Sequence, residues 1–146
     1  MNELIIDNQT IQDKIYTIRG VQVMLDEDLA VLYNVETKVF NQAVKRNIER
    51  FPEKFRFQLS KSEYENLRSQ FVTSSLDNSL RSQIVTLESQ RGKHRKYLPY
   101  VFTEQGVSML SAVLRSQTAI EVSIKIIDSF VNMRKFLSQN ASLFTR

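Results

Sequence analysis

Two short runs of β-branched and other apolar residues near the start of the chain are typical of strands. They cover 14–18 and 21–25, and the Arg19–Gly20 pair between them predicts a hairpin. Further along, residues 55–59 alternate apolar and polar side chains with a period of two. That alternation predicts a half-buried strand, with one face on a core and the other in water.

A second hairpin is expected in the middle of the chain. Its strands are predicted at 83–87 and 97–102, and the polar segment 90–95 between them forms an exposed tip. Pro99 lacks a backbone donor, so we expect this hairpin to lie at a sheet edge.

Helical periodicity follows the first hairpin in two segments. An acidic triplet, 26–28, favours the first turn of a short helix, because a helix N-terminus attracts negative charge. Asn34 tolerates the left-handed conformation that ends a helix. Thr37 then predicts the cap of a second helix over 37–51, which Pro52 prevents from continuing.

Three further helices are expected towards the C-terminus. Ser60 and Glu63 have capping-box spacing at the start of a helix that runs to about residue 70. Thr103 predicts the cap of a helix to about residue 115, and a last helix is predicted over about 119–137.

The helix predicted over 37–51 has one apolar and one polar face. At 100° per residue, Val39, Phe40, Val44 and Ile48 share the apolar side. The opposite face carries amide and ammonium groups, which can pair with adenine N6 and N7, with guanine acceptors or with phosphates. These base-edge candidates are Lys38, Asn41, Gln42 and Lys45. An ordinary solvated amphipathic helix would show the same pattern.

The last predicted helix is apolar over an arc of roughly 200°, wider than a helix lying on one core requires. One interpretation is that a second subunit covers part of it, with Ile126 and Met133 in the dimer contact and Ile120, Ile124 and Val131 on the chain's own domain. The other interpretation is that the helix sits deep within its own core.

Composition removes several classes of protein. The 146 residues include no cysteine and one histidine, which excludes disulfides, thiolate zinc sites and multi-histidine metal cages. No glycine-rich phosphate loop and no membrane-spanning segment is present, and residues 1–7 lack the basic stretch and apolar run that are typical of a signal peptide. We expect a cytoplasmic, nucleoid-associated protein with no cofactor, no metal, no membrane partner and no small-molecule substrate.

Positive charge is concentrated in two stretches, although the formal net charge is only +4. The first, 36–58, has a local charge of +3 and includes Arg46 and Arg50. The second, 89–97, carries four bases and no acid. Two basic clusters in an otherwise acidic chain indicate an anionic partner such as nucleic acid. The phosphate-contact candidates are Arg46, Arg50, Arg91, Lys93, His94, Arg95 and Lys96.

These elements together predict an α+β fold. A helix-turn-helix over about 26–51, small winged-helix-like β-hairpins and C-terminal helices would form a single DNA-binding domain over 1–137, followed by a tail at 138–146. Helix-turn-helix geometry would place helix 37–51 in the major groove of double-stranded DNA and the basic hairpin 89–97 on phosphates.

Three blocks of sequence carry a resemblance to a known family. Residues 26–41 (DEDLAVLYNVETKVFN), 44–59 (VKRNIERFPEKFRFQL) and 97–107 (YLPYVFTEQGV) resemble the phage Orf-six N-terminal DNA-binding domain, which is grouped with the KilA-N domains of phage and large-virus regulators. The resemblance spans about 15–134. It implies DNA binding in prophage or bacterial regulatory proteins, without catalysis. Asn34 stands where the family is expected to have glycine.

The leading hypothesis is therefore a sequence-selective DNA-binding regulator, acting as a homodimer if the last helix pairs. The alternative is a protein-binding module of antirepressor type that uses the apolar last helix. Catalysis is not expected, because His94 lies between Lys93 and Arg95, whose charges disfavour its protonated form.

Overall fold

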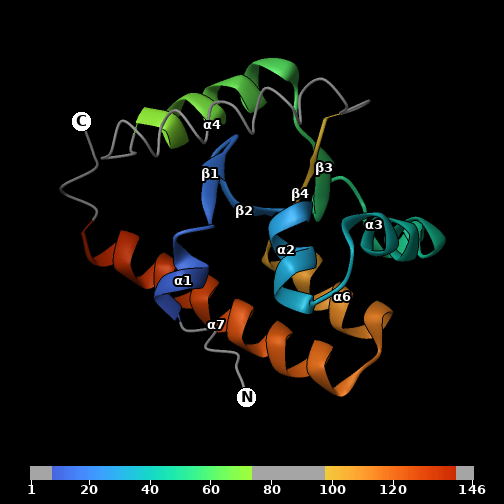
Figure 1. Ribbon diagram of the computed structural model, residues 1–146. Coiled ribbons are helices and arrows are strands. Elements are labelled where there is room, and N and C mark those ends of the chain that lie inside the picture. The colour runs from blue at the N-terminus through green and yellow to red at the C-terminus, as the bar shows by residue number, and fades with distance from the viewer. Residues whose placement is uncertain (1–7, 74–97, 141–146) are drawn as a thin grey trace. The chain divides into compact units, whose positions relative to one another are not determined.

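The computed structural model describes residues 8–73 and 98–140. Contacts between residues divide the chain into two compact units. The first combines Met1–Phe57 with Val101–Arg146, and the second is Gln58–Tyr100. The structure has the predicted α+β class, with a sheet and C-terminal helices (Figure 1). The single domain expected over 1–137 stays a prediction.

The predicted N-terminal hairpin is confirmed. Strand β1 (Tyr16–Ile18) pairs antiparallel with β2 (Val21–Leu25), and the innermost partners are Ile18 and Val21. The two turn residues have positive φ, 57° at Arg19 and 75° at Gly20. Two-residue hairpin turns need this backbone because its twist matches that of the strands, and glycine adopts it at no steric cost.

The sheet order is β1-β2-β4-β3, with β3 at Arg56–Gln58 and β4 at Tyr100–Phe102. Strand β4 pairs antiparallel with β2, placing Phe102 opposite Met24. The expectation of an edge strand is wrong, because β4 lies between β2 and β3. Pro99 is tolerated since it directly precedes the strand, where its carbonyl accepts a hydrogen bond from the Leu59 N–H at 3.0 Å.

Helix α7 (Gln117–Gln139) is the longest element of the first unit. Figure 1 shows it running past the N-terminal elements, and α1 (Asn8–Gln12), α2 (Asp26–Tyr33) and α6 (Glu104–Leu114) all pack against it. Helix α1 was not predicted from the sequence. The last helix was predicted over about 119–137, and the observed helix is two residues longer at each end. The Ser116 hydroxyl caps it by accepting a hydrogen bond from the Ala119 N–H.

The core of the first unit is built around aromatic rings. Phe102 of β4 makes edge-to-face contacts with Phe40 and Phe51, with centroid distances of 5.4 and 5.8 Å. Phe40 also lies 6.4 Å from the Tyr33 ring of α2. Such pairs contribute about 0.5–1.5 kcal/mol each beyond their burial. They attach α3 (Thr37–Arg46) to the sheet and to α2.

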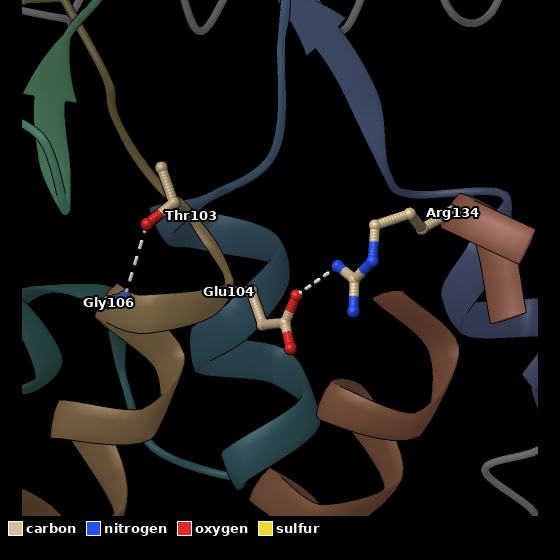
Figure 2. A network of polar contacts seen from close by, with 4 residues as sticks. All are labelled: Thr103, Glu104, Gly106 and Arg134. Carbon is tan, nitrogen blue, oxygen red and sulfur yellow. Dashed lines mark hydrogen bonds and ion pairs between the residues drawn. The ribbon is translucent and has the colours of Figure 1, made fainter. Parts of the chain in front are cut away.

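The start of α6 is fixed by a close approach to the chain before β3. The Thr103 hydroxyl accepts a hydrogen bond from the Gly106 N–H at 3.3 Å, which confirms the predicted cap (Figure 2). The same residue binds the Phe55 carbonyl through its N–H and its hydroxyl, at 3.0 and 3.2 Å. Figure 2 also shows Arg134 of α7 paired with Glu104 of α6 at 2.6 Å.

The second unit contains α4 (Lys61–Thr73). Its predicted capping box is confirmed, because the Ser60 N–H donates to Glu63 Oε1 at 2.8 Å and the Glu63 N–H donates to Ser60 Oγ at 3.0 Å. The strand predicted at 83–87 and the basic tip at 89–97 lie outside the described residues. No helix among the described residues is long and apolar enough to cross a membrane.

Candidate nucleic-acid interface

Helices α2 and α3 are joined by the three-residue turn 34–36. Asn34 has the left-handed backbone that the sequence predicted, with φ 61° and ψ 45°. Its N–H donates to the Val31 carbonyl, and the next N–H, that of Val35, donates back to the Ala30 carbonyl, both at 3.0 Å. These bonds satisfy carbonyls that a helix end otherwise leaves unpaired, so the turn has a defined geometry.

A buried hydrogen bond anchors this helix pair to α7. The Tyr33 hydroxyl lies 2.6 Å from Ser123 Oγ, and both side chains are buried. Burial raises the pKa of Tyr33 to about 12, although the bond to Ser123 acts in the opposite direction. The hydroxyl therefore stays protonated at physiological pH, and its hydrogen bond with Ser123 joins α2 to α7.

Helix α3 begins at the predicted residue but differs in its cap and in its C-terminal end. Thr37 is its first residue and not its cap, since Glu36 occupies the cap position without a side-chain hydrogen bond. The helix ends at Arg46, where the prediction continued to residue 51. The Asn47 side-chain amide donates to the Ala43 carbonyl at 2.9 Å, competing with the helix ladder, and a separate 3-10 turn follows at Ile48–Arg50.

Most of the predicted polar residues of α3 are exposed. Phe40 and Val44 are fully buried. At 100° of rotation per residue, Gln42 lies on the side of the helix opposite to these two residues. We call the exposed residues of the helix around this direction the α3 outer face: Lys38, Val39, Gln42, Lys45 and Arg46. It carries three positive charges and one amide. Val39 was predicted to be core, but 48% of its side chain is exposed.

Asn41 does not belong to this face. Its amide Nδ2 donates to Asp26 Oδ2 at 3.1 Å, and Asp26 is only 5% exposed at the start of α2. The Asn41 Oδ1 atom is buried and has no hydrogen-bond partner among the residues that the structure describes. The residue proposed from sequence as a base contact therefore links α2 to α3. The pairing of position 26 with position 41 was not visible in the sequence, because it depends on how the helices cross.

The predicted phosphate contacts divide into two groups. Arg46 is exposed on α3, and Arg50 is exposed in the 3-10 turn that follows. The basic residues of the second cluster lie outside the described residues: Arg91, Lys93, His94, Arg95 and Lys96.

The exposure expected along α7 differs from the structure at three of its isoleucines. Ile126 is fully buried and Met133 is half-buried, because the buried arc of α7 that faces its neighbours is centred near Ile126. Ile120 and Ile124, which were assigned to the domain, are 45% and 55% exposed. The apolar arc is wide, as predicted, but its uncovered flank is the opposite one.

The matched sequence identifies the class as a phage-type regulatory domain. A family model described as the ORF6N domain matches residues 13–113, about two-thirds of the chain. The chain belongs to the ORF6N family. The match includes β1 to α4 and reaches nearly to the end of α6, so the α3 outer face lies inside it. Neither the curated proteins nor the solved structures contain a match to this chain.

Proposed function

We propose that this chain is a sequence-selective regulator that binds double-stranded DNA with α3 in the major groove. The α3 outer face carries the proposal, since it follows a short turn after α2 and combines an amide with three cationic side chains. A helix-turn-helix protein presents its second helix to base edges in this way. Family membership supports a regulatory role.

Each side chain on this face has a distinct role in the proposal. Gln42 points directly away from the core and pairs with adenine, whose N7 accepts and whose N6 donates. Lys38 and Lys45 contact guanine acceptors or nearby phosphates. Arg46 and Arg50 contact phosphates, which position the helix without selecting sequence.

Selection from a random duplex library, followed by fluorescence anisotropy at several salt concentrations, tests the proposal. The protein should enrich one sequence and bind it more tightly than a scrambled duplex. Lys45→Gln should lower the slope of log affinity against log salt by about 0.9 if Lys45 contacts a phosphate. Lys125→Gln, at an exposed position of α7, is the matched control. The absence of any enriched sequence and of any salt-dependent binding would contradict the proposal.

The proposal includes a homodimer formed through the uncovered flank of α7. Ile120, Ile124, Ile127 and Val131 lie along it with spacings of four, three and four residues, which is the repeat of a helix-pairing seam. A two-fold dimer would meet half-sites about 34–36 Å apart.

Analytical ultracentrifugation tests the dimer. Ile120→Glu with Ile124→Glu should give a folded monomer, while Val21→Glu, at a 41% exposed valine of β2, should leave the dimer intact. If the wild-type protein were monomeric at tens of micromolar, this result would contradict the proposed dimer.

The same exposed isoleucines favour the second candidate function, an antirepressor-type module that binds a regulatory protein. That function requires no selectivity for DNA. Electrophoretic shifts on random and selected duplexes separate the two functions, since only the DNA-binding regulator discriminates between them.

A further inference from the structure

Val39 is an apolar side chain on the most polar surface of the helix pair. It is 48% exposed, whereas the apolar residues that hold α3 on the core, Phe40 and Val44, are fully buried. At 100° per residue, Val39 lies about 60° from Gln42 and about 20° from Arg46. Packing among the described residues, 8–73 and 98–140, therefore does not account for an apolar residue at this position.

The neighbours of Val39 indicate what it contacts. An apolar patch for a protein partner would need several adjoining apolar residues, but the other residues of the α3 outer face are the amide Gln42 and three cationic side chains. In the major groove, the only apolar group on a base edge is the 5-methyl of thymine, and it lies among hydrogen-bonding atoms and near phosphates. The α3 outer face likewise carries one apolar side chain among hydrogen-bonding and positively charged groups.

We propose that Val39 is a specificity-determining residue that packs on a thymine 5-methyl next to the base pair contacted by Gln42. Residues three apart on a helix have Cβ atoms about 5–6 Å apart, and base pairs are stacked about 3.4 Å apart. The two side chains therefore reach neighbouring base pairs. This inference rests on the proposed DNA-binding function and adds a required thymine beside the adenine.

Single replacements of thymine by deoxyuridine in the selected duplex test the contact, because they remove the methyl and leave the hydrogen-bonding edge unchanged. One replacement, within a base-pair step of the adenine read by Gln42, should weaken wild-type binding about four-fold, the effect of burying one methyl-sized group. Val39→Ala should bind the thymine duplex more weakly by a similar factor and should no longer distinguish thymine from deoxyuridine there.

Two variants serve as controls. Val39→Thr keeps one methyl and should retain part of the preference for thymine. Val21→Ala, at an exposed valine outside α3, should retain all of it. Because alanine has the higher helix propensity, Val39→Ala should not unfold α3, and thermal unfolding of the variant checks this.

The outcomes separate this inference from the proposed function. Selective binding with no sensitive thymine, or a thymine preference that persists in Val39→Ala, would overturn the role of Val39 and leave the DNA-binding function intact. The absence of any duplex binding would overturn both.

Discussion

Gly106→Ala should destabilise the protein, although alanine is the better helix former. A Cβ at Gly106 would lie 2.4 Å from the Phe55 carbonyl oxygen and 3.3 Å from Phe102 Cβ. The gap to the carbonyl must open by about 0.6 Å to reach even 3.0 Å, the lower limit for such contacts. That carbonyl accepts both hydrogen bonds from Thr103, so its displacement also strains the cap of α6.

The expected magnitude follows from opposing terms. Overpacking costs about 1–3 kcal/mol, and weakening a hydrogen bond to this partly buried carbonyl costs up to about 1 kcal/mol more. The gain in helix propensity offsets at most about 1 kcal/mol, and less in a first turn. The free energy of unfolding should therefore fall by about 1–3 kcal/mol.

Urea-induced unfolding, followed by circular dichroism, measures this change. Ser108→Ala, at an exposed position of the same helix, is the matched control and should change the free energy of unfolding by less than about 0.5 kcal/mol. If Gly106→Ala were neutral or stabilising, helix propensity would dominate at this position, and the close packing of α6 on the Phe55 carbonyl would be refuted.

Three other changes test the supports of the interface by the same unfolding assay. Asn41→Ala should cost about 1–2 kcal/mol, because it removes a donor from the buried Asp26 carboxylate; an unchanged stability would contradict the link between α2 and α3. The wild-type protein should lose stability at high pH, and Tyr33→Phe should abolish that loss. The pKa of Tyr33 is about 12 in the native state and about 10 in the unfolded state. Its contribution to the free energy of unfolding of the wild type is therefore complete below pH 10 and declines as the pH rises to 12. A parallel decline in both proteins would contradict this. Arg134→Ala should cost less than about 1 kcal/mol, since its ion pair with Glu104 is largely exposed; a cost of several kcal/mol would show that the pair is a major support of α7.

Local interactions account for the parts of the fold that the sequence predicted well. The turn at Gly20, the capping box at Ser60 and the Thr103 cap each depend on residues within a few positions of one another. Their backbone geometry follows from side-chain chemistry that is visible in the sequence.

Long-range packing accounts for the parts that were wrong. The edge position predicted from Pro99 failed because β2 and β3 both pair with β4, and a proline just before a strand does not prevent this. On α7 the width of the apolar arc was visible, but which flank is covered depends on where its neighbouring helices dock. The solvent exposure of Val39 could not be predicted either, since a helical wheel gives relative directions and does not locate the edge of the core.

The sequence selectivity of Gln42→Ala is the most direct test of whether the α3 outer face recognises DNA. Anisotropy titrations would compare the selected duplex with a scrambled one, for the wild type, Gln42→Ala and Gln105→Ala, the last at an exposed glutamine of α6. The ratio of the two affinities should fall at least about five-fold in Gln42→Ala, as expected for losing about 1 kcal/mol or more of base discrimination, and should be unchanged in Gln105→Ala. An equal loss of affinity for both duplexes, or no loss for either, would contradict the proposal that α3 selects the sequence.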